Sequence, residues 1–220
     1  MEEENPSKAK HITTTATKPH SRFINNLINL DTTWSLHIHQ ICQPIPRSLL
    51  KFLEISGDGR FWFPIPIALF ISLSSKSDHL RSLLIGLLIG SLLDLLFVGL
   101  IKFTIKRPRP VYNKGMHLTV AVDHWSFPSG HSSRVCFIAS FLYLSLDSMV
   151  ASWLQLGLNE NEWIDSKGNM VNYFVYLVCL WSMLTSMSRV LLGRHFVFDV
   201  IAGACLGVFN AHLVYRFLKF

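Results

Sequence analysis

Long apolar runs separated by short polar links make up most of the chain. Four runs approach or reach the ~20 residues that a helix needs to cross ~30 Å of hydrocarbon, and they cover residues 82–101, 135–158, 171–188 and 196–215. A fifth run, residues 61–75, is shorter and contains Pro64 and Pro66. No ten-residue alternating pattern typical of a barrel is present. The pattern predicts an all-α, polytopic transmembrane helical bundle of about five to six spans.

Apolar residues before the first run recur at intervals of three or four. This spacing places them on one face of a helix: Phe23, Leu27, Leu30, Trp34, Ile38 and Ile41. We expect this helix to lie flat in the headgroup layer and to break before Pro44 and Pro46. The predicted parts are a disordered polar tail over residues 1–22, one or more amphipathic interfacial helices over 23–56, and a transmembrane domain over 61–220.

The composition supports one integral membrane domain. Hydrophobic residues make up 50% of the chain and charged residues 15%, whereas a soluble domain carries ~25% charge. The net charge of +6 favours an anionic substrate or lipid surface, and nucleic acid is not expected because basic and aromatic residues are not interleaved on a soluble module. No CxxC pair occurs among the four cysteines, so neither a zinc site nor a disulfide framework is indicated: Cys42, Cys136, Cys179 and Cys205.

The distribution of positive charge predicts the orientation. Alternation of five spans would place the tail, the loop over residues 103–134 and the link over 189–195 on one face. That face would hold fifteen of the twenty Lys and Arg residues, and the opposite face would hold Lys76, Arg81, Lys167, Arg216 and Lys219. The face with more Lys and Arg is therefore predicted to be cytosolic. With a sixth span, the N-terminal tail would lie on the opposite face. Three polar clusters also fall on the face with more Lys and Arg.

The first polar cluster is KFTIKRPRP, residues 102–110, at the end of an apolar run. Pro108 and Pro110 stiffen the segment, and rigid arginine forks suit bidentate binding of phosphate. A basic patch that pairs with anionic lipid headgroups is the alternative. Two roles are likewise open for Lys106, Arg107 and Arg194: each would contact either a second charge on the substrate or the headgroup layer.

The second polar cluster is FPSGHSSR, residues 127–134. Pro128 and Gly130 permit a tight turn, after which a helix begins with amides that can receive an anion. We expect these donors near Ser129 and Gly130, with His131 beside the bound phosphate. A plain loop with a surface histidine is the alternative, since short motifs recur by chance.

The third polar cluster is SRVLLGRHFVFD, residues 188–199. His195 and Asp199 are four residues apart, so a helix would place them on one face within hydrogen-bond reach. A carboxylate that holds one imidazole nitrogen fixes the tautomer and exposes the other nitrogen. Asp199 also lies inside an apolar run, where an ionised group costs roughly 3 kcal/mol and is seldom kept without a partner. A purely structural pair is the alternative.

Together the clusters supply the groups that phosphoryl transfer without a metal would use: cations, amide donors and two histidines. Their spacing also resembles the three-part signature of the type 2 phosphatidic acid phosphatase (PAP2) superfamily, with Lys102, six residues and Arg109-Pro110; then Pro128-Ser129-Gly130-His131; then Ser188-Arg189, five residues, His195, three residues and Asp199. No signature position departs from the pattern.

The resemblance covers about residues 61–220 and implies a PAP2/haloperoxidase-like fold. It implies an integral membrane lipid phosphate phosphatase that acts on phosphatidic acid, isoprenoid diphosphates or related lipids and needs no metal or other cofactor. The segments FPSGHSSR and GRHFVFD are most similar to plant lipid phosphate phosphatases of the beta type and to presqualene or polyisoprenoid diphosphate phosphatases. The relatives point to the endoplasmic reticulum membrane.

The resemblance also implies a role for each signature residue. His195 would attack phosphorus and form a phosphohistidine, Asp199 would orient His195, and His131 would protonate the leaving group. The substrate phosphate would be bound by Lys102, Arg109, Ser129, Gly130 and Arg189. Reversed roles for the two histidines stay open, and so do a lipid phosphotransferase and a non-catalytic anion-binding membrane protein.

Overall fold

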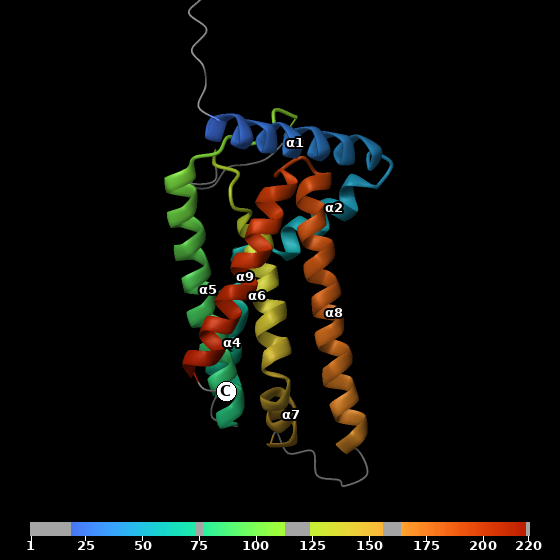
Figure 1. Ribbon diagram of the computed structural model, residues 1–220. Coiled ribbons are helices and arrows are strands. Elements are labelled where there is room, and N and C mark those ends of the chain that lie inside the picture. Colours follow the sequence, from blue (N-terminus) through green and yellow to red (C-terminus); the bar gives the residue numbers. More distant parts are fainter. Residues whose placement is uncertain (1–18, 74–76, 113–123, 156–163, 219–220) are drawn as a thin grey trace, which may run out of the picture.

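A computed structural model describes residues 19–73, 77–112, 124–155 and 164–218. Over these residues the chain is built from helices (Figure 1), as the apolar runs predict. In chain order the helices are α1 (Pro19–Ile41), α2 (Arg47–Ser56), α3 (Gly59–Trp62), α4 (Pro64–Leu73), α5 (Asp78–Ile105), α6 (Gly130–Leu144), α7 (Leu146–Gln155), α8 (Ile164–Leu191) and α9 (Val197–Leu218).

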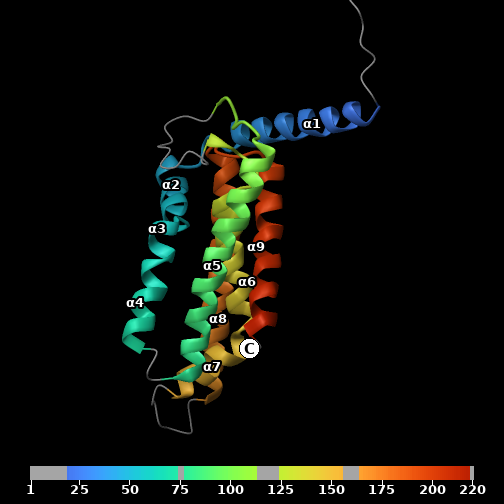
Figure 2. The same cartoon turned by 90° about the vertical axis from the view of Figure 1, so that its left-hand side faces the viewer.

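Helices α5, α6, α8 and α9 form a bundle in which α6 contacts the other three (Figures 1 and 2). Within the described residues, α5, α9 and Asn169–Leu191 of α8 are each long and apolar enough to cross a membrane. The bent pair of α6 and α7 makes a fourth candidate span. The predicted runs 82–101 and 171–188 lie inside α5 and α8, and the run 196–215 begins one residue before α9.

The predicted run 135–158 does not form one straight helix. It is divided between α6 and α7, which meet at an angle of 68°, and residues 156–158 lie outside the described part of the chain. The break falls at Ser145, whose amide donates to the carbonyls of Phe141 and Leu142. The bend keeps Met149 of α7 in the same apolar core as Leu142 of α6, where a straight continuation would carry the helix past that core.

The run 61–75 is also divided, between α3 and α4. With ten residues, α4 is about 15 Å long, which is too short to cross a bilayer alone. Pro64 starts α4, because proline fits the first turn of a helix but not its interior. Figure 2 shows α2, α3 and α4 following one another down one side of the bundle.

Two glycines of α9 let the backbone of that helix pack directly against the backbone of α6. A Cβ on Gly203 would lie 2.4 Å from the carbonyl oxygen of Ser129, and one on Gly207 would lie 2.1 Å from that of Ser133. On the other side of α6, Phe137 and Phe141 fill the space left by two glycines of α5. The apolar core around these contacts contains Leu83, Leu87, Phe137, Ile138, Phe141, Leu142, Met149, Val171, Val175, Ala211 and Val214.

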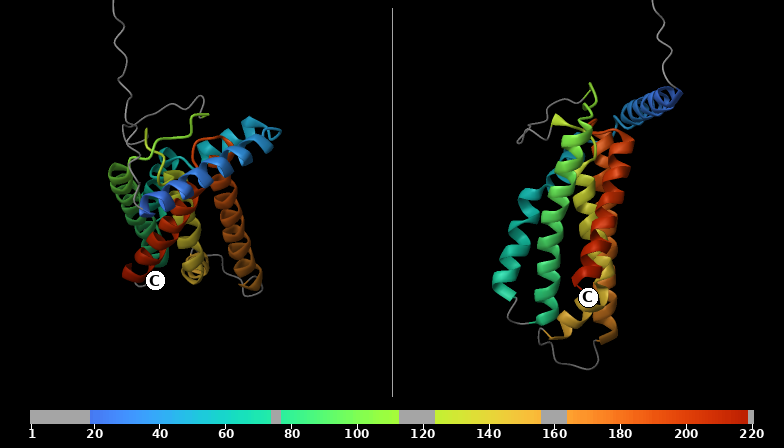
Figure 3. Two further views of the ribbon diagram at one scale, coloured as in Figure 1. Left: turned by 45° about the horizontal axis from the view of Figure 1, so that its top comes forward. Right: turned by 60° about the vertical axis from the view of Figure 1, so that its left-hand side comes forward.

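Helix α1 lies across the end of the bundle where α5 and α8 finish and α6 and α9 begin (Figures 1 and 3). Its apolar residues are exposed, among them Phe23 and Trp34, whereas Asp31 and Ser35 are buried. The helix therefore docks through a polar face. It begins at Pro19, so residues 19–22 belong to α1 and not to the predicted tail; residues 1–18 lie outside the described part.

Candidate active site

The first and second polar clusters are joined by a short stretch of β pairing. Pro108 and Trp125 form an antiparallel bridge, and the amide of Ser126 donates to the carbonyl of Arg107 at 2.8 Å. The side chain of Ser126 reaches the carbonyl of Pro108 at 3.0 Å. The stiff proline-rich segment is thus fastened directly before the turn that starts α6.

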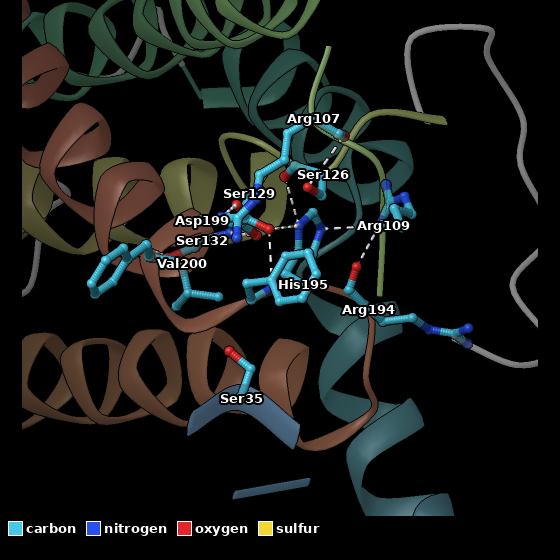
Figure 4. Close-up of polar contacts among 12 residues, drawn as sticks. Ser35, Arg107, Arg109, Ser126, Ser129, Ser132, Arg194, His195, Asp199 and Val200 are labelled. Atoms are coloured by element: carbon cyan, nitrogen blue, oxygen red, sulfur yellow. Dashed lines mark hydrogen bonds and ion pairs between the residues drawn. The ribbon is translucent and has the colours of Figure 1, made fainter. Parts of the chain in front are cut away.

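The third cluster meets both of the others at the same end of the bundle (Figure 4). The amide of Ser129 donates to the carbonyl of Asp199 at 2.9 Å, and Arg109 Nη1 donates to the carbonyl of Arg194 at 2.9 Å. The structure therefore brings together three segments that the sequence predicts on one face, although about ninety residues separate the first from the last.

His195 lies at the centre of this assembly and is 2% exposed. Its Nδ1 is 2.8 Å from the carbonyl oxygen of Ser126, and its Nε2 is 3.2 Å from Nη1 of Arg109. The carbonyl can only accept a hydrogen bond and the guanidinium can only donate one. Nδ1 therefore carries the proton, and Nε2 presents its lone pair next to a cation.

The environment keeps His195 in its neutral form. Burial, together with the positive charges of Arg109, Arg189 and Lys102, lowers the pKa of His195 well below its ordinary value, while the hydrogen bond to Ser126 works in the opposite direction. A low pKa preserves the Nε2 lone pair in neutral solution. These three cations are the ones that the sequence assigns to phosphate binding.

Asp199 does not fix the tautomer of His195 as predicted. Its Oδ2 is 3.7 Å from Nδ1 of His195, beyond hydrogen-bond reach, and the Ser126 carbonyl takes the bond instead. Asp199 Oδ2 accepts from the amide of Phe196 at 2.9 Å, and Oδ1 accepts from Arg107 at 2.7 Å. The carboxylate faces the imidazole as a nearby negative charge and also caps the start of α9.

Arg107 holds Asp199 to the interfacial helix. Its Nη2 donates to Asp31 of α1 at 2.7 Å, and its guanidinium lies over the ring of Phe196 at 4.1 Å. Asp31 Oδ1 also accepts from the amide of Phe198 at 3.0 Å. Arg107 is therefore engaged by two buried carboxylates, so neither of the two roles predicted for it, a second substrate charge or the headgroup layer, fits its contacts.

Arg189 is completely buried at the end of α8. Its Nη1 donates to Oε1 of Glu54 in α2 at 2.6 Å, and Arg194 Nε donates to the same oxygen at 3.2 Å. Nε and Nη2 of Arg189 have no hydrogen-bond partner among the described residues. Arg194 is thus held inside the protein by Glu54 and does not reach the headgroup layer.

Lys102 and His131 also lie near His195. Lys102 is 4% exposed, although it lies at the end of an apolar helix where a lysine would otherwise extend to water. His131, in the first turn of α6, lies within electrostatic range of Arg189, His195 and Lys102. No described residue forms a hydrogen bond with its Nε2, which is buried.

The amide predicted to receive an anion at Ser129 is already used. It donates to the carbonyl of Asp199, and the Ser129 hydroxyl accepts from the amide of Ser132 at 3.4 Å as the N-cap of α6. Ser129 therefore joins α6 to α9 and does not supply its amide to a ligand. Gly130, the first residue of α6, packs closely on Val98 of α5.

Sequence reasoning missed four groups that shape this site: Asp31, Ser35, Glu54 and the carbonyl of Ser126. The Ser35 hydroxyl accepts from the amide of Val197 at 2.9 Å, so α1 and Asp199 together satisfy three successive amides at the start of α9. Asp31 and Ser35 are four apart on α1 and share a polar face, which is a detectable signal. Nothing in the sequence links Glu54 to an arginine 135 residues later.

The arrangement brings together a neutral imidazole nitrogen, donors on a buried guanidinium that have no partner among the described residues, and a second histidine whose Nε2 is buried. A tetrahedral anion suits such a place, because its oxygens match planar guanidinium donors and its central atom can accept a nitrogen lone pair. Within the described residues, no group of three or more His, Cys, Asp or Glu side chains is arranged to hold a metal ion.

Comparison with known proteins agrees with this chemistry. The model of the PAP2 superfamily matches residues 80–220. A curated relative, the probable lipid phosphate phosphatase beta of Arabidopsis thaliana, is 40% identical over 203 residues, which cover 90% of this chain and 93% of the relative. Phosphatidylglycerophosphatase B of Haemophilus influenzae is 25% identical over 95 residues, 43% of this chain and 33% of that protein.

Two crystal structures share the fold. The transmembrane PAP2-type phosphatidylglycerolphosphate phosphatase of Bacillus subtilis superposes with a TM-score of 0.69 at 23% identity, covering 89% of this chain and 87% of that one. The LpxE protein of Aquifex aeolicus gives a TM-score of 0.52 at 21% identity, covering 82% and 94%. The bundle is therefore the one used by these membrane proteins.

Proposed function

Because this chain belongs to the PAP2 superfamily, we propose that it uses His195 and His131 to hydrolyse phosphate esters of lipids through a covalent phosphohistidine. The chain is an integral, multi-pass membrane protein and a lipid phosphate phosphatase of that family. Phosphatidic acid, isoprenoid diphosphates and related lipids are the proposed substrates, and the endoplasmic reticulum remains the proposed location.

His195 is the proposed nucleophile because its Nε2 carries no proton. The lone pair accepts a hydrogen bond from Arg109 at 3.2 Å, and we propose that Arg109 exchanges this bond for the phosphate oxygens when substrate binds. In the first step Nε2 of His195 bonds to phosphorus as the bond from phosphorus to the lipid oxygen breaks. The imidazole becomes positively charged, and Asp199, 3.7 Å from Nδ1, stabilises that charge. The Ser126 carbonyl keeps the Nδ1 proton in place throughout.

The buried cations stabilise the phosphoryl group during transfer. Its negative charge is spread over three equatorial oxygens, so fixed donors placed in advance lower the barrier. Arg189 offers Nε and Nη2, which have no partner among the described residues. Arg109 lies beside Nε2 of His195, and Lys102 adds a third positive charge to the same pocket.

His131 is the proposed acid and base. In its protonated form it donates a proton to the departing lipid oxygen, a role worth ~10²- to 10⁴-fold in rate. It then accepts a proton from the water that attacks phosphorus, the bond from phosphorus to nitrogen breaks, and inorganic phosphate leaves. Each step balances without another reactant.

The observation that carries this function is the unprotonated Nε2 of His195, which accepts from Arg109. Beside it, Nε and Nη2 of Arg189 and Nε2 of His131 have no hydrogen-bond partner among the described residues. The experiment is trapping of radiolabelled phosphate with an alkaline detergent quench, because the bond from phosphorus to nitrogen hydrolyses in acid, followed by mapping of the labelled peptide at alkaline pH. We expect label on His195, with H195A unlabelled and without turnover but folded. Label on His131 would reverse the two roles, and turnover by H195A would refute the mechanism. Product analysis with an added acceptor alcohol distinguishes hydrolysis from phosphotransfer.

Five crossings are proposed for the chain. α5, α8 and α9 each make one, and the bent pair of α6 and α7 makes another. The fifth is broken and consists of α2, α3 and α4 in succession, of which α2 packs on α8 and α4 packs on α5. This arrangement puts α1 and the active site at one membrane face and the start of α5 at the other.

A further inference from the structure

The match to the family model begins at residue 80, yet a carboxylate before that point touches two buried cations of the site. Glu54 of α2 accepts from Arg189 at 2.6 Å and from Arg194 at 3.2 Å. Its side chain is 18% exposed, while those of the two arginines are 0% and 3% exposed. The two cations nearest the end of α8 therefore share one carboxylate that the family signature does not include.

The bond from Glu54 determines which edge of Arg189 remains available. A guanidinium has two edges that can bind two oxygens side by side, one formed by Nη1 and Nη2 and the other by Nε and Nη2. Glu54 occupies Nη1, and the unpartnered atoms of Arg189 are Nε and Nη2. These two N–H groups point the same way, which is the geometry that grips two oxygens of a phosphate.

We propose that Glu54 is a positioning residue that turns the Nε–Nη2 edge of Arg189 toward the substrate phosphate. This inference rests on the phosphatase function proposed above, and it adds a member to the active site from a helix outside the signature. Without the carboxylate, the long arginine side chain would have several rotamers available and would lose part of its binding energy in becoming ordered on the ligand.

Helix α2 is held rigidly enough for this role. Trp181 of α8 donates its indole N–H to the Ser56 hydroxyl at 2.8 Å, and Leu50 is buried. Gly57, directly after α2, lies so close to α8 and α6 that an added Cβ would come within 2.8 Å of Thr185 and 3.6 Å of His131. Glu54 is therefore fixed relative to both Arg189 and the proposed acid.

Glu54 is also ionised, as the role requires. Two guanidinium groups, those of Arg189 and Arg194, donate hydrogen bonds to its carboxylate, and such donors favour the charged form. The charged carboxylate can act on phosphate binding in two opposite ways. By neutralising a cation it weakens attraction for phosphate, and by orienting Arg189 it strengthens binding. Weaker phosphate binding after removal of the carboxylate would show that orientation of Arg189 dominates, and tighter binding would show that neutralisation of the cation dominates.

The experiment measures the dissociation constant of inorganic phosphate for E54A and E54Q, from the phosphate-dependent rise in Tm of the purified full chain in detergent. Positioning predicts weaker phosphate binding, by about tenfold for E54A, within the 10- to 100-fold range typical of residues that orient a ligand-binding group. E54Q keeps one acceptor oxygen and should lie between E54A and the wild type.

D58N is the matched control. It removes the same charge four residues further on, where Asp58 pairs with the exposed Arg60 at 2.9 Å, and phosphate binding should stay within twofold of the wild type. A purely structural role for Glu54 would lower the Tm without phosphate and leave the dissociation constant unchanged. Unchanged or tighter phosphate binding in E54Q overturns the proposal. If E54A does not fold, the dissociation constant of E54Q alone decides whether Glu54 positions Arg189.

A double variant tests the route through Arg189. E54A combined with R189A should bind phosphate as R189A alone does, because the oriented group is then absent. If the double variant bound phosphate about tenfold more weakly than R189A, Glu54 would act through another group, such as Arg194, and its assignment as the residue that positions Arg189 would be wrong. Failure of the wild type to release phosphate from phosphatidic acid would instead refute the proposed function, and the phosphate constants do not depend on turnover.

Discussion

His195 is oriented by a main-chain carbonyl, and this has consequences for its chemistry. The Ser126 carbonyl has no titration of its own, so the tautomer with an unprotonated Nε2 is favoured wherever His195 is neutral. Arg109 lies on the other side of the ring at 3.2 Å. Both contacts favour the tautomer with the proton on Nδ1, but they act on the pKa of His195 in opposite directions, since Arg109 lowers it and the Ser126 hydrogen bond raises it.

The pH dependence of activity should report this pKa. His195 must be neutral to attack phosphorus, so activity falls on the acid side as His195 becomes protonated. Because the pKa of His195 lies well below its ordinary value, we expect the acid limb of kcat/KM to lie below pH ~6.5. Replacing Arg109 with Leu removes a positive charge beside the ring, which raises the pKa of His195 and moves the limb to higher pH.

The measurement is kcat/KM against pH for the wild type and Arg109→Leu on the same substrate, so that ionisation of the substrate cancels in the comparison. R109L should also lower kcat/KM at every pH, since Arg109 is a proposed phosphate ligand. An acid limb at the same pH in both proteins would contradict the electrostatic influence of Arg109 on His195.

At the scale of helices, the start of α9 depends on α1. Asp31 and Ser35 accept from the amides of Phe198 and Val197, which a helix start otherwise leaves unsatisfied. Near the C-terminal end of α1, His39 Nδ1 is 2.7 Å from the carbonyl oxygen of Leu191 in α8. The interfacial helix therefore bridges the two helices that flank His195.

Replacing Asp31 with Ala should destabilise the protein by about 3 kcal/mol, because it breaks a buried ion pair with Arg107 and leaves the Phe198 amide without its acceptor. Thermal unfolding in detergent measures the effect. The control is Thr32→Ala on the exposed side of α1, whose hydroxyl bonds only within the helix, and it should change stability by less than ~0.5 kcal/mol. Equal effects of both changes would show that α1 does not hold α9 through Asp31.

The contact between α6 and α9 should tolerate no added carbon at Gly207. A Cβ there would lie 2.1 Å from the Ser133 carbonyl and 2.8 Å from the Phe137 amide, so the helices must separate at a cost of about 1–3 kcal/mol. Gly99 of α5 has no atom within 4 Å of the corresponding position. Gly207→Ala should therefore lower the Tm, and Gly99→Ala should leave it unchanged or raise it slightly through higher helix propensity. A Tm for G207A equal to that of G99A would contradict the close packing.

At the scale of the whole molecule, the active site and α1 occupy one end of the bundle and the start of α5 occupies the other (Figures 1 and 2). Among the described residues, the Lys and Arg side chains lie mostly at the end that holds the site, and Arg81 and Arg216 lie toward the other (Figure 1). Positive charge is retained on the cytosolic side of membranes. The active site is therefore expected to face the cytosol.

Labelling of single cysteines tests this orientation and the broken crossing together. In a background with the four native cysteines replaced by serine, Gln40→Cys on α1 and Asp78→Cys at the start of α5 are both exposed. In sealed microsomes whose cytosolic face is outward, an impermeant maleimide should label position 40 directly and position 78 only after detergent. Labelling of both positions without detergent would show that α2 to α4 do not cross, and the reverse pattern would show the opposite orientation.

The sequence by itself determined the helical class and the positions of α5, α8 and α9, and it predicted eight residues for the candidate site. These follow from local signals: apolar length limits which segments can cross a membrane, and motif spacing identifies groups whose chemistry is compatible with phosphate. The one-face arrangement also followed, because alternation of spans depends only on their number and order.

Only the tertiary structure decided which partner each of these groups has. His195 is oriented by Ser126 and not by Asp199, Arg107 joins Asp199 to Asp31, and Glu54 holds Arg189. The physical reason is that hydrogen bonds and buried ion pairs act over about 3 Å, between residues that are 69 to 135 positions apart in these cases. Sequence spacing carries no information about such contacts until packing of the helices brings the residues together.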